Sequence, residues 1–178
     1  SRTTHPMQTN SPLWRRSFLI SRAGWDVSLS VGGADDFEYY LRLVVSADYF
    51  SFVPEVLFHL RVHESDRLST GAPSSEGLTA TLRGRELAYN HLSKSKYWST
   101  ELAEAYLVKC RTTYVTALRY GDIEQIKSLE SWLLPICPIC ENGKSILVIR
   151  RLRKILGARF LGRMIVIFVS VKGVLGFR

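Results

Sequence analysis

The chain has 178 residues, of which 46% are hydrophobic and 22% are charged, a composition that is typical of a globular protein and excludes a disordered one. Its net charge of +8 is unevenly distributed, because nine of the 24 basic residues and none of the 16 acidic residues lie in 144–178. The rest of the chain is nearly neutral, and the cationic tail suggests an anionic partner, either lipid headgroups or nucleic acid.

The first region of the chain, 1–68, mixes aromatic residues, turns and short apolar runs. Its part 11–24 indicates a strand or a short helix that ends at Gly24. The run 34–46 predicts a helix, because its apolar residues recur every three or four positions. The apolar face of this helix consists of Phe37, Leu41 and Val44.

Charged residues also fit a helix in 34–46. Glu38 precedes Arg42 by four residues, the order in which such an ion pair stabilises a helix. Asp35 and Asp36 fall in the first turn, where the helix dipole favours negative charge. Taken alone, adjacent acids at this position are most often simple partners of the dipole.

The run 55–63, which follows Pro54, alternates in hydropathy and predicts a strand with one buried and one polar face. The buried face consists of Val56, Phe58, Leu60 and Val62. The opposite face consists of Leu57, His59, Arg61 and His63.

The second region, 69–140, begins with a linker of small and helix-breaking residues and continues as three predicted helices. The first covers 76–97. The second begins at a Ser99/Thr100 cap and ends at Gly121, and the third runs from Asp122, with Gln125 completing a capping box, to Pro135. Their packing faces are expected to hold Leu102, Tyr106, Cys110, Thr113 and Ala117 on the second helix and Ile123, Ile126 and Leu133 on the third.

The three cysteines are an odd number and indicate no disulfide framework. Cys137 and Cys140 form a lone CxxC pair, and zinc would require two further ligands at a suitable spacing. Reduced thiols without a metal or redox role are therefore expected.

The third region, 141–178, alternates apolar residues with Lys and Arg and predicts a basic amphipathic tail. Its last apolar run, 164–171, is too short to span a bilayer. An anionic membrane surface is the favoured partner of 144–178, and the alternative is a packing helix or strand. No nucleic-acid partner is expected, because aromatic stacking groups are sparse in the tail.

An ordered set of motifs over nearly sixty residues resembles the second half of the catalytic domain of family-two nucleotide-sugar glycosyltransferases, which have the GT-A fold. The order and the spacing of the motifs both agree with that family. The motifs are Leu13-Trp14-Arg15-Arg16, Gly24-Trp25-Asp26, Asp35-Asp36-Phe37-Glu38, Leu41-Arg42-Leu43, Val53-Pro54-Glu55 and Arg61-Val62-His63.

The resemblance implies a role for several residues. Asp36 corresponds to the family's catalytic base, which takes the proton of an acceptor hydroxyl during an inverting transfer. Asp35 and Trp25 are implied to contact the acceptor. The donor diphosphate is implied to lie near Gly33, Arg61 and His63, and His63 is also implied to contact a divalent cation, Mg or Mn, in a complete enzyme.

The resemblance also implies a fold. It predicts an α/β class, with a partial GT-A domain and an incomplete mixed sheet in 1–68, followed by a mainly α-helical C-terminal region. The family's nucleotide-binding half and its Asp-x-Asp motif have no counterpart in the sequence. We therefore expect the chain alone to be inactive.

The expected partners are a nucleotide-diphosphate sugar as donor and a saccharide or lipid-linked acceptor. The expected location is cytoplasmic, with peripheral attachment to the inner face of the cytoplasmic membrane. The alternative from a different class is a non-catalytic helical interaction module with a basic membrane-binding tail.

Overall fold

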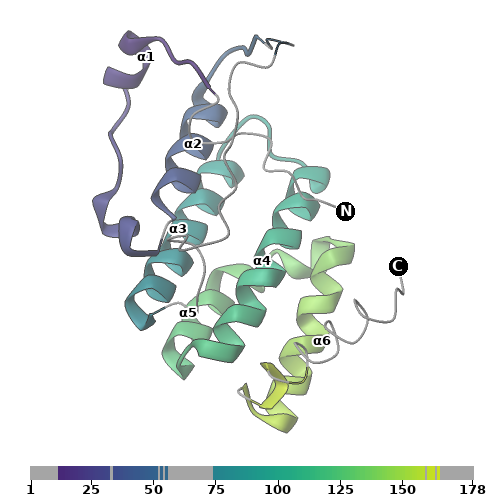
Figure 1. Cartoon of the computed structure of the whole chain (residues 1–178). Coiled ribbons are helices and arrows are strands. Elements are labelled where there is room, and N and C mark those ends of the chain that lie inside the picture. The colour runs from purple at the N-terminus through teal and green to yellow at the C-terminus, as the bar shows by residue number, and fades with distance from the viewer. Residues whose placement is uncertain are drawn as a thin grey trace.

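The computed structural model describes residues 12–32, 34–51, 53, 55, 74–158, 160–162 and 164. These residues form a stack of helices with a shorter helical segment along one side (Figure 1). The elements are α1 (Arg16–Ile20), η1 (Val27–Gly32), α2 (Asp35–Ser46), α3 (Ser75–Ser93), α4 (Thr100–Tyr120), α5 (Ile123–Leu133), η2 (Cys137–Ile139) and α6 (Glu141–Leu156), where η denotes a 3-10 helix.

The predicted α/β class, with a partial GT-A domain and an incomplete mixed sheet, is wrong. Every regular element in the described part of the chain is a helix, so the protein is mainly helical. The physical reason lies in the partner of α2, which packs on helix α3 and on η1 and not on a sheet. The predicted strand 55–63 lies outside the described residues, apart from Glu55.

The starts of α4 and α5 follow from local capping, as the sequence predicts. The side chain of Ser99 accepts a hydrogen bond from the backbone N–H of Leu102 at 3.2 Å and begins α4. Asp122 and Gln125 form the predicted capping box of α5, with reciprocal hydrogen bonds of 2.8 and 3.0 Å. These bonds satisfy backbone groups that a helix leaves unpaired at its ends.

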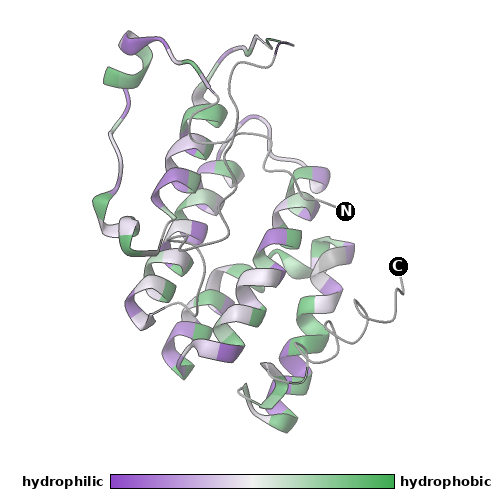
Figure 2. Cartoon of the chain, viewed as in Figure 1, coloured by the Kyte–Doolittle hydropathy of each residue, from purple (hydrophilic) through white to green (hydrophobic). Residues whose placement is uncertain are grey.

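The core lies between α3, α4, α5 and α6, and α2 adds its apolar side to it. The predicted inward faces of α4 and α5 are buried, with the exception of Leu102, which is partly buried, and Ile123. Ile123 is 50% exposed, because it occupies the first position of α5. Figure 2 shows that the helices carry hydrophobic and hydrophilic residues on different sides.

The N-terminal elements approach α3 closely at Gly84. A Cβ atom at Gly84 would lie 2.7 Å from the Cβ of Ala34, the residue that precedes α2. Only a glycine therefore allows this separation between α3 and the start of α2. The same contact brings Leu29 of η1 into the interior, where it is fully buried.

The C-terminal helix α6 is joined to the stack by a buried ion pair. Arg153 donates to both carboxylate oxygens of Glu130 on α5 at 2.8 and 2.9 Å. Tyr114 on α4 donates its hydroxyl to the same carboxylate at 2.5 Å. Within the described residues, none of the helices combines the length and the apolar character needed to cross a membrane.

Candidate active site

The acidic pair of the sequence begins helix α2, as predicted. Asp36 is half-buried, and the backbone N–H of Phe37 donates to its Oδ1 at 2.6 Å. Asp35 is half-buried beside it in the first turn. The start of the helix presents its positive end here, where the helix dipole interacts favourably with negative charge.

Tyr40 lies one turn after Asp36 and connects it to Trp25. Partial burial raises the pKa of the Tyr40 hydroxyl, and the negative charge of Asp36 raises it further. The Trp25 ring meets the Tyr40 ring edge to face, with centroids 5.8 Å apart. Tyr40 therefore lies within electrostatic reach of Asp36 and within contact of Trp25.

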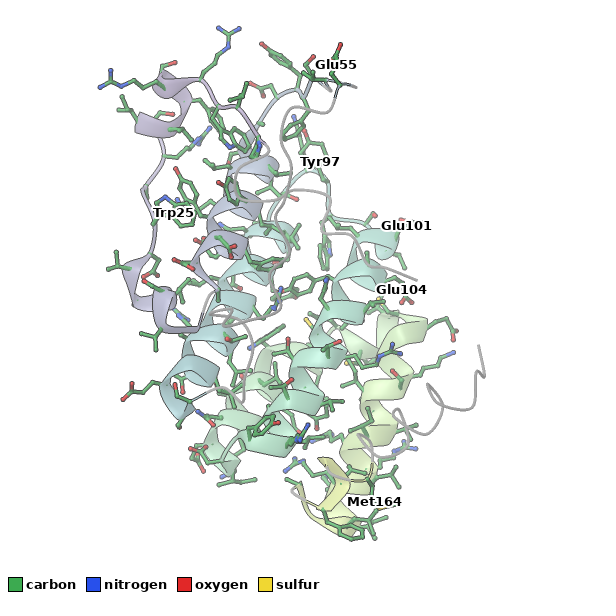
Figure 3. The ribbon with its side chains drawn as sticks, viewed as in Figure 1. Trp25, Glu55, Tyr97, Glu101, Glu104 and Met164 are labelled. Atoms are coloured by element: carbon green, nitrogen blue, oxygen red, sulfur yellow. The ribbon has the colours of Figure 1, made fainter. Side chains whose placement is uncertain are left out.

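Trp25 presents part of its ring to solvent. It stacks on Tyr39 with centroids 4.5 Å apart, and it is nevertheless 43% exposed. Figure 3 shows Trp25 in the segment between α1 and η1, beside α2. An exposed ring that is fixed by a second ring is a preformed surface for the apolar face of a ligand.

Further aromatic residues extend this surface toward α1. The Trp14 ring stacks on Tyr40 at 6.4 Å and on Phe18 at 5.7 Å, and Phe50 meets its edge at 6.3 Å. Phe50 is 57% exposed. The aromatic cluster consists of Trp14, Phe18, Trp25, Tyr39, Tyr40 and Phe50.

Arg42 holds the Trp25 segment against α2. Its guanidinium donates to Gly24 carbonyl oxygen at 2.8 Å and also to that of Ala23. The same group pairs with Glu38 at 2.8 Å, as the spacing of the two residues predicts. Glu38 is only 2% exposed and has a second partner in His91 of α3, at 3.0 Å. The position of Trp25 thus depends on a buried carboxylate with two partners.

The turn after Trp25 is also fixed. Asp26 accepts from the hydroxyl and the backbone N–H of Ser28, at 2.6 and 3.0 Å. These hydrogen bonds lower the pKa of the Asp26 carboxyl. Because they stabilise the charged acceptor, the start of η1 is held at neutral pH.

The donor-side residues of the sequence prediction, Gly33, Arg61 and His63, lie outside the described residues. Of the other predicted site residues, Asp35 and Asp36 are adjacent at the start of α2, and Trp25 contacts Tyr40 of the same helix. Within the described part, no group of three or more His, Cys, Asp or Glu could hold a metal ion. The carboxylates at the start of α2 therefore do not by themselves fit the divalent cation that the resemblance implies.

The cysteines lie elsewhere and are buried. Burial raises the pKa of Cys110 to about 12 and that of Cys137 to about 11. Burial also raises the pKa of Cys140. All three thiols are therefore protonated at neutral pH, and a protonated thiol is a weak nucleophile and metal ligand.

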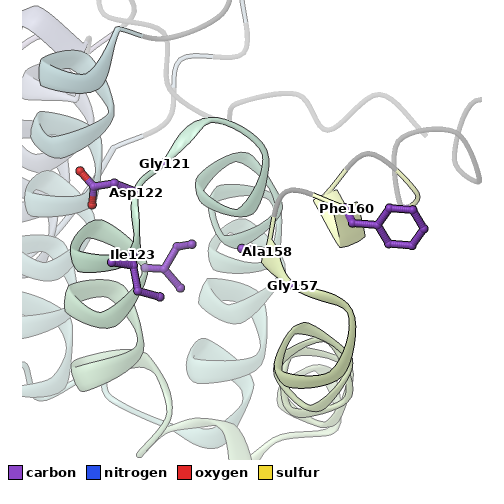
Figure 4. A pocket seen from close by; sticks show the side chains of 7 residues that line it. Gly121, Asp122, Ile123, Gly157, Ala158 and Phe160 are labelled. Carbon is purple, nitrogen blue, oxygen red and sulfur yellow. The ribbon is translucent and has the colours of Figure 1, made fainter.

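Two surface hollows lie away from Asp36. One, of about 420 Å³, lies between the start of α5 and the end of α6, and its walls include Ile123, Ile126 and Phe160 (Figure 4). Its one carboxylate, Asp122, caps α5. The other, of about 500 Å³, lies between η1 and α3 and includes Glu76 and Arg83. Neither hollow combines an aromatic surface with an available carboxylate.

Comparisons with protein-family models, with curated proteins and with solved structures find no match to this chain. The function is therefore argued from the residues at the start of α2.

Sequence reasoning missed most of the aromatic cluster and the second role of Arg42. Tyr40 could have been found, because it lies four residues after Asp36 on a predicted helix. Trp14 appeared in a motif, but no local signal indicates that it contacts Tyr40. The bonds from Arg42 to two backbone carbonyl oxygens have no sequence signature.

Proposed function

We propose that this chain supplies the acceptor side of an inverting sugar transfer, in which a nucleotide-diphosphate sugar donates to a saccharide or lipid-linked acceptor. Asp36 is the general base, and Trp25 and Asp35 contact the acceptor. The observation that carries the proposal is the connection of an exposed Trp25 ring, through Tyr40, to a carboxylate at a helix start.

The residues match the chemistry of a sugar acceptor. One face of a pyranose ring carries mainly C–H groups and packs on an aromatic ring, while its hydroxyls require hydrogen-bond acceptors. Trp25 provides the ring and Asp36 provides the acceptor. Tyr40, between them, offers a hydroxyl that stays protonated at neutral pH and can donate.

The proposed reaction has one bond made and one broken. The acceptor oxygen attacks the anomeric carbon of the donor sugar, the bond from that carbon to the diphosphate breaks, and the electron pair leaves with the nucleotide diphosphate. Asp36 takes the proton of the acceptor hydroxyl as the new bond forms. The donor-binding part of the proposal rests on the resemblance of the motifs alone.

The acceptor site is tested by nuclear magnetic resonance of the indole N–H groups of Trp14, Trp25, Trp98 and Trp132. Titration with a panel of mono- and oligosaccharides is expected to shift the Trp25 signal. Trp98 and Trp132 pack on Tyr89 in the helical stack, so their signals are internal controls. If no saccharide class in the panel moves the Trp25 signal, the acceptor site is wrong.

The base is tested by Asp36→Asn. In a transfer assay with the chain joined to a nucleotide-sugar-binding half, this change is expected to abolish turnover and to leave the Trp25 shift in place. Asp48→Asn, two residues after the end of α2, is the matched control and is expected to change neither. Turnover that survives Asp36→Asn would remove Asp36 from the role of base.

The chain alone is expected to bind donors weakly. Calorimetric titration with uridine and guanosine diphosphate sugars should give no binding in the micromolar range. Micromolar affinity would show that the described helices, or the rest of the chain, already hold a donor site.

The second candidate is a non-catalytic helical interaction module. It is favoured by the capped, well-packed helices α3 to α5, which carry no cluster of reactive groups. Under this alternative, Asp36→Asn and Trp25→Ala leave function unchanged, whereas changes on the helical stack abolish partner binding.

A further inference from the structure

Helix α6 has an inward side that is set by charge. Arg153 and Arg150 both point toward Glu130, with nitrogen to oxygen distances of 2.8 and 3.6 Å. The Arg153 side chain is only 13% exposed. Ile146 is fully buried on the same side. These contacts fix the rotation of α6 about its axis, so they also decide which residues face outward.

The outward side of α6 is apolar. Val148, Leu152 and Ile155 are 53%, 40% and 78% exposed, and their spacing of four and three residues forms one stripe along the helix. Leu156, one turn after Leu152 at the end of the helix, borders this stripe and is 39% exposed. The outward face of α6 is defined here as Val148, Leu152, Ile155 and Leu156.

Cations flank the outward face. Arg151 and Lys154 are exposed and have no ion pair within the described residues. Lys144, one turn before Val148, pairs with the exposed Glu141, and exposed pairs of this kind contribute little. The face therefore combines apolar side chains with positive charge at its border.

The position of α6 leaves this face open. Figure 1 shows α6 at the edge of the helical stack, on the side away from α1 and α2, and Figure 3 shows Met164 beyond its end. Contiguous apolar side chains that stay exposed on a globular protein mark a surface that binds a partner or a membrane.

We propose that the outward face of α6 binds an anionic lipid surface. The apolar stripe enters the boundary between headgroups and acyl chains, and Arg151 and Lys154 reach lipid phosphates with their long side chains. The hydrophobic contact and the charge attraction act together, because juxtaposed cations add to membrane affinity. This binding does not depend on the proposed sugar transfer.

Charge decides against the other occupants. A second copy that packed its own α6 on this face would bring Arg151 and Lys154 close to the same cations of the first copy. Nucleic acid would satisfy the cations but would leave Val148, Leu152 and Ile155 without an apolar partner. A lipid surface satisfies both kinds of group.

The test is sedimentation of the full chain with vesicles of neutral phosphatidylcholine and with vesicles in which about a third of the lipid is anionic phosphatidylserine. Binding is expected with the anionic vesicles and to fall as salt is added. Arg151→Gln with Lys154→Gln is expected to weaken that binding on the order of tenfold. Ile155→Ser should also weaken it.

Matched variants separate a membrane surface from a general effect of charge or hydropathy. Lys94→Gln with Lys127→Gln removes two cations elsewhere on the helical stack, and Val27→Ser changes an 80% exposed residue on η1. Both controls should bind as the unchanged chain does, and circular dichroism should report the same helix content for every variant.

Several results would overturn the proposal. Equal recovery with neutral and anionic vesicles would exclude the charge contribution. If Lys94→Gln with Lys127→Gln weakens vesicle binding as much as Arg151→Gln with Lys154→Gln does, the outward face of α6 is not the binding surface. Dimerisation that Ile155→Ser abolishes, without vesicle binding, would assign the face to a second copy. Tighter binding to a single-stranded oligonucleotide than to anionic vesicles would assign it to nucleic acid.

Discussion

The Trp25 segment and helix α6 lie on opposite sides of the helical stack (Figure 1), and each is attached to it by an ion pair between an arginine and a buried carboxylate. On one side, Glu38 is 2% exposed and pairs with Arg42, which holds the Trp25 segment. On the other side, Glu130 is 7% exposed and pairs with Arg153 of α6. In both places, a buried carboxylate pairs with an arginine at 2.8 Å. Breaking such a pair leaves an uncompensated buried charge.

The two sides differ in what they expose. The Arg42 side presents aromatic rings beside Asp36, which is a surface suited to a polar ligand with an apolar face. The α6 side presents an apolar stripe bordered by cations, which is suited to an anionic, partly apolar surface. Buried ion pairs thus fix position at each end, while the exposed residues decide the partner.

Their partner sets also differ, and this predicts unequal sensitivity. Glu130 has two arginines and the Tyr114 hydroxyl, and burial and the neighbouring Glu130 raise the pKa of that phenol well above its ordinary value. Glu38 has Arg42 and His91. When Arg153 is removed, Arg150 is the basic residue that stays near Glu130. When Arg42 is removed, His91 stays near Glu38.

The largest effect is expected for Arg153→Ala. It leaves Glu130 buried with only the Tyr114 hydroxyl and the more distant Arg150, so the free energy of unfolding should fall by about 4 kcal/mol. Urea denaturation followed by circular dichroism measures the change.

A double variant controls for the buried charge itself. Glu130→Gln combined with Arg153→Met removes both charges and keeps similar volumes, and it should be far less destabilised than Arg153→Ala. If the double variant is as unstable as the single one, the loss comes from packing of α6 and not from an uncompensated carboxylate.

A smaller effect is expected for Arg42→Ala, because His91 stays beside Glu38. The free energy of unfolding should fall by about 3 kcal/mol, at the low end for a broken buried pair. The Ala23 and Gly24 carbonyl oxygens also lose their donor, so the resonance of the Trp25 indole should move toward that of an exposed tryptophan.

Arg83→Ala is the matched control for Arg42→Ala. Arg83 makes an exposed pair with Glu86 at 2.9 Å, and its loss should change stability by less than about 0.5 kcal/mol. If Arg42→Ala behaves like Arg83→Ala, the Trp25 segment is held by its ring contacts and not by the Glu38 pair.

Local signals predicted the helices, whereas the resemblance predicted the wrong fold class. Ser99, Asp122 and Gln125 mark helix starts through bonds that span three residues, and such bonds are visible in the sequence. The order of motifs in 11–69 says nothing about which surface α2 packs on. That surface is α3, reached through Gly84, and the contact joins residues about fifty positions apart.

The candidate site was predictable to the same extent. The place of Asp36 at a helix start follows from the pattern around it, and so does the pair of Glu38 and Arg42. The contact of Trp25 with Tyr39 and Tyr40 depends on how the chain returns after α1, which no local pattern encodes. The basic amphipathic character of α6 follows from its alternation of apolar residues with Lys and Arg, but no local pattern indicates that Ile149 packs against the core whereas Leu152 and Ile155 are exposed.

The smallest effect concerns pH and distinguishes the two sides of the molecule. All three cysteines of the chain lie in 110–140. Cys110 lies on α4, and Cys137 and Cys140 lie in the segment that leads into α6. Burial raises the pKa of Cys110 to about 12 and that of Cys137 to about 11, from an ordinary value of 9.0. Above the ordinary value, the unfolded chain therefore loses protons that the folded chain retains, and stability falls as pH rises. Between pH 8.5 and 10 the expected loss is about 2 kcal/mol.

Urea denaturation at a series of pH values measures this loss, and Cys110→Ala with Cys137→Ala removes its source. The double variant should be less stable at pH 7 but should show a flatter dependence on pH between 8.5 and 10, because its unfolded state no longer releases those two protons. Hydrogen exchange should place the alkaline opening in α4 and α6 before α2, since Cys110 lies on α4 and Cys137 lies in η2, directly before α6. If the free energy of unfolding of the double variant depends on pH as steeply as that of the unchanged chain, Cys110 and Cys137 are not the source of the loss. Opening that begins in α2 would show that the Arg42 side, and not the α6 side, is the more sensitive to alkali.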